Sequence, residues 1–217
     1  MAGLILDAIS ENEGFTATPQ TDSHVVGSGS NRILIAGIRV DPDPSSVITS
    51  VTYSGIPMSL VGNISYGSPA KVVYLYQLKN PPSGTANIVA NFSGGGSPYV
   101  NIAAVSYTNA VQDATQGTIK ITNTGSGVAS LSTTLTSLLN NSIQICMVGT
   151  QSVGCSAGTN TSSISSNNAG LYGSSNPISP AGSNTITINS NSTDNMGMIS
   201  AIFSPINTPP FESFLLG

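Results

Sequence analysis

Four apolar segments follow one another closely within residues 30–78, and short breaks separate them. The first, 32–40, is a continuous apolar run that two prolines stop soon afterwards, so we expect a central, buried strand. The next two, 47–53 and 56–61, alternate apolar with small polar residues across a Ser-Gly dipeptide, which predicts a hairpin. The fourth, 71–78, is rich in β-branched and aromatic side chains. Spacings this short leave no room for crossover helices, so the sheet should be largely antiparallel.

Segments of the same texture predict further strands at 15–18, 22–26, 85–92, 99–107, 117–122, 129–136, 142–149, 185–188 and 196–203. Residues 151–182 carry the least pattern, and we expect either a surface-binding loop region or a flexible one there. So many short strands with Gly, Ser and Pro turns predict an all-β fold, a two-sheet antiparallel β-sandwich of jelly-roll-like character. We place this domain at 15–204, between an N-terminal arm of residues 1–14 and a C-terminal tail of residues 205–217.

Charged residues are scarce in this chain: 6% of the 217 residues are Asp, Glu, Lys or Arg, against roughly 25% in an ordinary soluble domain. The polar surface should therefore be neutral and rich in hydrogen-bonding groups. The net charge of -4 includes no basic cluster that could neutralise phosphates, so nucleic-acid binding is not expected. No apolar window is long enough to span a bilayer and the first residues lack a cationic start, so we expect neither membrane insertion nor conventional secretion.

The segment 154–158, Gly-Cys-Ser-Ala-Gly, matches the pattern of a hydrolase nucleophile elbow. Such an elbow requires a helix after the serine and, in that family, a later histidine, whereas the only histidine here, His24, precedes Ser156. One histidine and two cysteines do not build a zinc site. Asp41 and Asp43 could hold calcium, although two carboxylates flanked by prolines more often form a plain turn. We therefore expect no enzymatic activity and no cofactor or metal.

The two cysteines leave two alternatives open. Cys146 lies in an apolar segment and Cys155 in a Gly/Ser loop, and the two could form one disulfide. Free thiols, one of them buried, are favoured for a chain that carries no secretion signal.

Two groups of residues are candidates for contacts with other molecules. Tyrosines in or beside loops with many Asn and Ser neighbours could contact a glycan, although tyrosines at strand ends are more often half-buried packing residues. These are Tyr66, Tyr99 and Tyr172. Apolar residues near both ends have no predicted strand long enough to bury them, and we expect contacts between subunits there. These are Leu4, Ile5, Leu6, Phe211, Phe214, Leu215 and Leu216.

The order of several segments resembles a β-sandwich module that recurs in bacteriophage virion proteins and bacterial surface proteins. The strongest part is the turn Asn-Pro-Pro-Ser-Gly-Thr at 80–85, which follows an aromatic strand. The resemblance covers about residues 15–204 and implies a structural or adhesive role, with no catalytic residues. The segments that carry it are 30–38, 51–61, 73–85 and 104–108.

Two functions follow as expectations. The first is a non-enzymatic virion structural protein, a phage capsid decoration (cement) or fibre-associated protein, assembled in the host cytoplasm and bound to a repeating particle surface. Its partners would be other virion subunits of the capsid or tail, and we expect a homo-oligomer, with a trimer as our guess. The alternative is a carbohydrate-binding or adhesin module, whose partners would be surface glycans.

Overall fold

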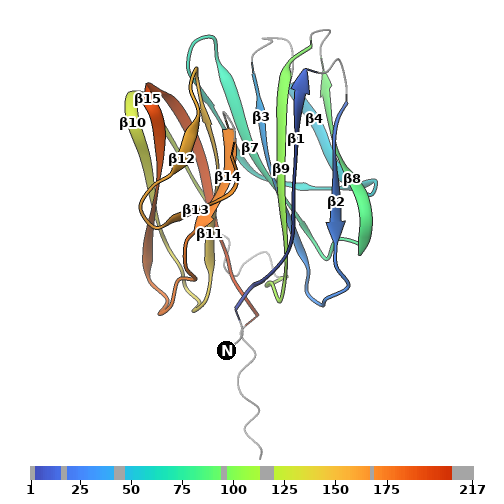
Figure 1. Cartoon of the computed structure of the whole chain (residues 1–217). Coiled ribbons are helices and arrows are strands. Elements are labelled where there is room, and N and C mark those ends of the chain that lie inside the picture. The colour runs from blue at the N-terminus through green and yellow to red at the C-terminus, as the bar shows by residue number, and fades with distance from the viewer. Residues whose placement is uncertain are drawn as a thin grey trace, which may run out of the picture.

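The computed structural model describes residues 3–15, 19–41, 47–93, 97–112, 120–166 and 169–206. Within these ranges every regular element is a β-strand. The strands pair antiparallel in three sheets (Figure 1). Seen in Figure 1, the sheets stand side by side as layers, with β2 and β8 at one side and β10 and β15 at the other.

The five-stranded sheet lies in the middle and is called the central sheet. Its strands, in spatial order, are β1 (Ile5–Phe15), β9 (Tyr99–Thr108), β3 (Ile33–Val40), β7 (Lys71–Lys79) and β6 (Ser59–Tyr66). The four-stranded outer sheet contains, in order, β2 (Gln20–Val26), β8 (Gly84–Ser93), β4 (Val47–Tyr53) and β5 (Ile56–Pro57).

The remaining strands form the C-terminal sheet. Its order is β10 (Lys120–Thr136), β15 (Ser183–Phe203), β11 (Ile143–Thr150), β14 (Ala169–Ser174) and β13 (Thr161–Ser166), and β12 (Cys155–Ala157) pairs with β15.

The central sheet is buried on both faces, and β3 shows this most clearly. All eight residues of β3 are buried. Because successive side chains of a strand point to opposite faces, its residues enter two different cores in alternation. Ile33 and Ile35 pack toward the C-terminal sheet, whereas Leu34 and Ile38 pack toward the outer sheet. A continuous apolar run is therefore what this position in the fold requires.

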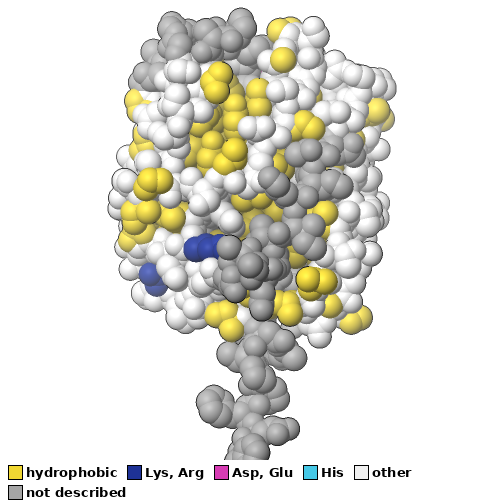
Figure 2. All heavy atoms as spheres, turned by 180° about the vertical axis from the view of Figure 1, so that it is seen from behind, with side chains coloured by type: hydrophobic (Ala, Val, Ile, Leu, Met, Phe, Trp, Pro, Cys, Tyr) yellow, Lys and Arg dark blue, Asp and Glu magenta, His cyan; other side chains and the backbone are white. Residues whose placement is uncertain are grey.

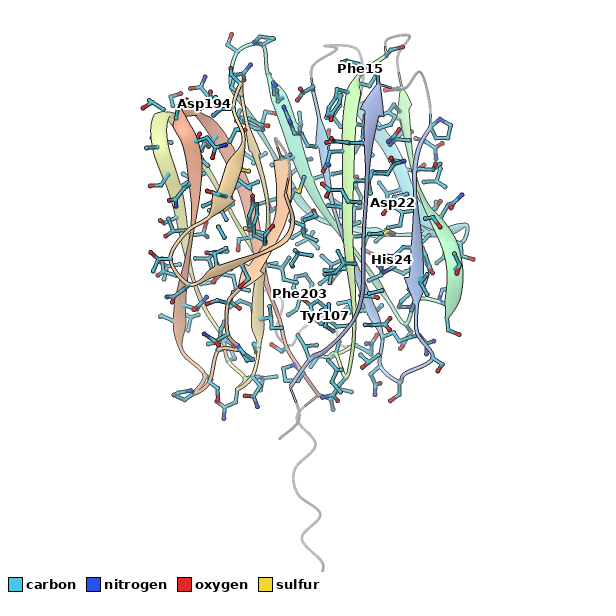
Figure 3. All side chains as sticks on the ribbon, viewed as in Figure 1. Phe15, Asp22, His24, Tyr107, Asp194 and Phe203 are labelled. Atoms are coloured by element: carbon cyan, nitrogen blue, oxygen red, sulfur yellow. The ribbon has the colours of Figure 1, made fainter. Side chains whose placement is uncertain are left out.

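The two cores draw on residues far apart in the sequence. Between the central and C-terminal sheets, Tyr107 and Phe203 belong to one cluster and point toward each other in Figure 3. Other members of this cluster are Val73, Leu75, Val105, Ile145, Met147, Leu171 and Ile199. Between the central and outer sheets, the core includes Ala36, Val51, Tyr53, Tyr76, Ile88 and Ile102.

The C-terminal sheet also encloses a core of its own. β15 has 21 residues and pairs with β10 along most of one edge. Along its other edge, residues 188–190 pair with β12 and residues 196–203 pair with β11. The sheet therefore curls, and the face turned away from the central sheet is filled by apolar side chains. These include Leu131, Cys146, Val148, Tyr172, Ile186, Ile188, Met196 and Met198.

The predicted antiparallel, all-β sandwich is confirmed, but it has three sheets rather than two. Strands β1 to β9 alternate between the central and outer sheets for the most part, and the jelly-roll-like character stays an interpretation of that order. The expected N-terminal arm differs from the structure, because residues 5–14 lie within β1 and pair with β9. The region 151–182 also differs, since it contains β12, β13 and β14.

Two glycines let the C-terminal sheet approach the central sheet closely. Gly149 and Gly197 are paired on β11 and β15, and the ring of Tyr66 lies on them. A Cβ atom added at Gly197 would come within 2.4 Å of Tyr66 Cδ1 and 3.0 Å of Tyr66 Cβ, which is closer than packed carbon atoms approach. Since both contacts are near the base of a buried ring, the side chain has little room to move aside.

We predict that Gly197→Ala lowers the free energy of unfolding by about 1–3 kcal/mol, the usual cost of overpacking. For a chain of this length that corresponds to a fall in melting temperature of about 2–4 °C per kcal/mol. Denaturant unfolding followed by circular dichroism measures the change. The control is Gly14→Ala in β1, where no atom lies within 4 Å of the added Cβ. Equal stability of the two variants would contradict the prediction.

Candidate functional site: the edge strand β1

β1 is the strand on which exposed apolar residues concentrate. It lies at one edge of the central sheet, with β9 as its neighbour in that sheet. Nine large hydrophobic residues of the described chain are exposed, and four of them lie on this one strand. They are Ile5, Leu6, Ile9 and Phe15, with 58%, 53%, 47% and 79% of their surface exposed. Scattered single residues of this kind are ordinary, but a row on one edge strand marks an interaction site.

Polar side chains of β1 fix the strand against β2 of the outer sheet. The Asp7 carboxylate accepts a hydrogen bond from the backbone amide of Gly27, at 2.7 Å. Further along, the side-chain amide of Asn12 donates to the carbonyl of Thr21, at 2.6 Å. The backbone of β1 is paired with β9 from Ile5 to Phe15, apart from one register shift between Leu6 and Ala8. The strand is therefore held on two sides, in one defined position.

Between these contacts lies a buried polar cluster around His24, the only histidine (Figure 3). His24 is fully buried, and its Nδ1 lies 2.7 Å from the Ser10 hydroxyl. Its Nε2 lies 3.0 Å from the Ser106 hydroxyl. Ser10 also contacts Asp22 at 2.5 Å, and Ser106 contacts Asp7 at 2.9 Å. The five side chains form one chain of contacts that joins β1, β2 and β9.

The number of hydrogen atoms available for hydrogen bonds limits how the side chains of this cluster can be protonated. Four contacts need four hydrogens, but two hydroxyl groups and a neutral imidazole supply only three. Burial raises the pKa of Asp22, against the opposing effect of its hydrogen bond with Ser10, and the charge of Glu11 raises it further. Burial also lowers the pKa of His24 to about 4, while the charge of Asp7 acts the other way. With both carboxylates charged and His24 neutral the cluster is therefore one hydrogen short, and burial favours the uncharged forms of Asp22 and His24.

The cluster resembles a catalytic triad in composition but not in arrangement. In a triad the histidine lies between the carboxylate and the serine, whereas here Ser10 lies between Asp22 and His24. His24 is 0% exposed, so a substrate cannot reach it in this structure. The cluster serves to close the edge between the central and outer sheets. Ser156, the serine of the elbow-like motif, lies on β12 in the C-terminal sheet, away from this cluster.

A second charged cluster connects the central sheet to the C-terminal sheet. The Asp41 carboxylate forms ion pairs with Arg39 at 2.7 Å and with Lys71 at 2.9 Å. The Lys71 ammonium also donates to the carbonyl of Gln151, at 2.6 Å. Arg39 and Lys71 are buried, and the negative charge of Asp41 offsets part of the free-energy cost of burying these two cations. Asp43, the second carboxylate of the considered calcium site, lies outside the described residues.

Burial removes two of the three tyrosines that we considered as glycan contacts. Tyr66 is 5% exposed on the paired glycines, and Tyr172 is fully buried in the core of the C-terminal sheet. The Tyr172 hydroxyl donates to the carbonyl of Cys155, at 3.1 Å. Tyr99 is half-buried and remains available. Its neighbour Phe15, at a ring-centroid distance of 5.1 Å, was not among the predicted contacts.

The predicted subunit contacts fall into three groups. Ile5 and Leu6 are exposed, as a contact surface requires. Leu4 is half-buried and packs against the core between the central and C-terminal sheets, so its apolar side chain is largely satisfied within the chain. The remaining candidates, Phe211, Phe214, Leu215 and Leu216, lie outside the described residues. Ile9 is the residue of this surface that the sequence analysis missed.

Neither Cys146 nor Cys155 forms a disulfide, and both are buried. Cys155 lies in β12 rather than in a loop. Burial raises the pKa of each thiol, so neither is reactive as a thiolate. The described part of the chain holds no group of three His, Cys, Asp or Glu residues that could bind a metal. Nor does that part contain a helix suited to crossing a membrane.

We predict that His24 makes the fold sensitive to acid. The pKa of His24 falls from 6.5 in the unfolded chain to about 4 in the folded chain. Between pH 6.5 and pH 4 the unfolded chain therefore binds a proton at His24 that the folded chain does not bind. The stabilisation is complete above about pH 6.5 and is lost as the pH falls toward 4, by roughly 2–3 kcal/mol. The raised pKa of Asp22 has the opposite sign and offsets part of this loss.

The measurement is urea unfolding at pH 7.5, 6.0 and 4.5, for the native chain and for His24→Gln, which cannot titrate at this position. The native chain should lose more stability than the variant on acidification, and the difference isolates His24. The same pH dependence in both proteins would contradict the prediction.

Comparisons of this chain with protein-family models, with curated protein sequences and with solved structures found no significant match. The resemblance to the phage and bacterial surface module therefore stays an interpretation of the segments that carry it.

Proposed function

We propose that this protein is a non-enzymatic structural protein that assembles through the edge strand β1. The observation that carries the proposal is the concentration of exposed Ile5, Leu6 and Ile9 on one rigidly held edge strand. In line with the resemblance, we propose a virion as the assembly and a capsid decoration or fibre-associated protein as the type. Other virion subunits, including copies of this chain, are then the partners.

The physics of sheet edges supports an assembling role. An edge strand presents unpaired backbone N–H and C=O groups, which are a template for another strand. Soluble proteins commonly shield such edges with lysine, proline or very short strands. β1 has eleven residues, among them no lysine and no proline. The single register shift after Leu6 is the one irregularity along it. Its three carboxylates, of Asp7, Glu11 and Glu13, accept hydrogen bonds within the chain. An edge this long, with four exposed large hydrophobic residues, is best explained if a partner covers it.

The composition of the surface fits the same role. Since only 6% of the residues are charged, neighbouring copies would repel each other little. Figure 2 shows one face of the molecule, where neutral polar groups and backbone predominate, with hydrophobic groups between them and few Lys or Arg atoms. Many copies with such a surface can pack closely on a particle, because they carry few like charges that would have to be neutralised.

The experiment that tests the proposal is multi-angle light scattering on Ile9→Lys and on the native chain, over a concentration series. A lysine in the middle of the contact should weaken association at least about tenfold, because it places a charge in an apolar interface. Ile9 is 47% exposed, so the variant should keep its fold by circular dichroism. The control is Leu138→Lys, which changes a residue that is 72% exposed outside β1.

The native chain and the control should form the same defined oligomer, and Ile9→Lys should shift toward the monomer. A native chain that stays monomeric throughout the series, or an oligomer that Ile9→Lys leaves intact, would contradict the proposal.

A further inference from the structure

The far end of β1 carries an aromatic pair that the core does not use. Phe15 is 79% exposed, the highest value among the large hydrophobic residues of the described chain. Its cross-strand partner on β9 is Tyr99. The ring centroids are 5.1 Å apart and the planes are inclined by 72°, an edge-to-face arrangement that fixes the orientation of the exposed ring. Figure 3 shows Phe15 at the end of β1, remote from His24.

A polar pair lies directly beside the aromatic pair. Glu13 and Asn101 are the next cross-strand partners, on the same faces of β1 and β9 as Phe15 and Tyr99. The Asn101 amide donates to Glu13 at 3.4 Å and to Glu11 at 2.9 Å. Asn101 is fully buried, whereas Glu13 is exposed and keeps acceptor positions free for a ligand.

The four residues Phe15, Tyr99, Glu13 and Asn101 are called the aromatic–carboxylate block. The backbone behind it is rigid, because the Asp41 amide donates to the Tyr99 carbonyl at 2.8 Å. Burial raises the pKa of Tyr99 to about 12, and its hydrogen bond and charge interaction with Glu13 act in the same direction. The phenol therefore stays protonated at any physiological pH. The block has no large side-chain rearrangement to make before binding.

We propose that the aromatic–carboxylate block is a binding site for a neutral saccharide. An aromatic face packs against the C–H face of a sugar ring, and carboxylate and hydroxyl groups bond to its hydroxyl groups. Phe15 and Glu13 lie two residues apart on the same face of β1, about 7 Å along the strand, so one sugar unit can contact the ring of Phe15 and the carboxylate of Glu13 together. Glu13 and Glu11 disfavour an anionic ligand. A sugar has an apolar C–H face for the ring of Phe15 and hydroxyl groups that can donate to the Glu13 carboxylate and to the Tyr99 oxygen, so one ligand uses the whole block.

This inference does not rest on the proposed assembly. Ile9 lies on β1 outside the aromatic–carboxylate block. The Ile9→Lys variant should therefore bind the same saccharide as the native chain. Conversely, changes at Phe15 should leave the oligomeric mass unchanged. The two proposals therefore fail independently.

The test begins with the full chain on an array of neutral oligosaccharides built from glucose, galactose, mannose and N-acetylglucosamine. The best binder is then titrated by saturation-transfer NMR. Phe15→Ala should weaken binding at least tenfold, and Phe15→Trp should retain or strengthen it, because a larger ring offers more stacking surface. Glu13→Gln, which keeps the shape but loses the charge, should weaken binding severalfold without abolishing it. Val47→Ala, at a residue 54% exposed on β4, is the control and should bind as the native chain does.

Three results would overturn the proposal. One is the absence of binding to any sugar of the array at millimolar concentration. A second is binding that Phe15→Ala leaves unchanged while the variant keeps its native circular dichroism and melting temperature. The third is a preference for a lysine-rich peptide over every sugar, with loss of binding in Glu13→Gln and at high salt, which would identify a cationic ligand instead.

Discussion

The structure depends on burial of the central sheet on both of its faces. Every residue of β3 contributes to this burial, and alternate residues of the strand enter two separate cores. Apolar burial is the largest stabilising contribution to folding, and here one sheet provides it twice. The one charged residue of β3, Arg39, is buried as well, and Asp41 and Lys71 complete an ion-pair cluster around it. The outer and C-terminal sheets are thus both positioned by the same five strands.

The central sheet has two edge strands. One edge is β6, which packs against β10 and β15 of the C-terminal sheet. The other edge is β1, whose apolar residues remain exposed. The contacts of Asp7 with Gly27, of Ser10 with His24 and of Asn12 with Thr21 hold β1 in place. Such an edge would suit the joining of other strands, as we propose, and the exposed ring of Phe15 lies at its end.

The sequence predicted the parts of the fold whose pattern is local. The apolar run at 32–40 and the aromatic segment at 71–78 became β3 and β7 almost residue for residue. Strands β12, β13 and β14 were missed, because small residues, mostly Ser, Gly and Ala, dominate them and their burial comes from distant partners such as β11 and β15. The third sheet could not be foreseen either, since no local pattern shows that the two halves of the chain share one core.

The candidate site shows the same limit. Tyr66 is buried because it rests on Gly149 and Gly197, more than eighty residues later in the chain, and nothing near Tyr66 in the sequence indicates that contact. Ile5 and Leu6 were predicted as contact residues because the chain starts with an apolar segment that we expected to be an arm reaching a neighbouring subunit. Ile9 and Phe15 were not, because their exposure depends on the position of β1 at the edge of a sheet.

Amide hydrogen exchange across β1, at low and high protein concentration, tests the central claim most directly. Assembly through Ile5, Leu6 and Ile9 requires that the backbone amides of residues 5–9 that do not bond to β9 become protected as the concentration rises. The amides of β3, already buried, should exchange equally slowly under both conditions. If exchange within β1 is the same at both concentrations while the mass of the particle increases, the copies assemble through another surface and the account is wrong.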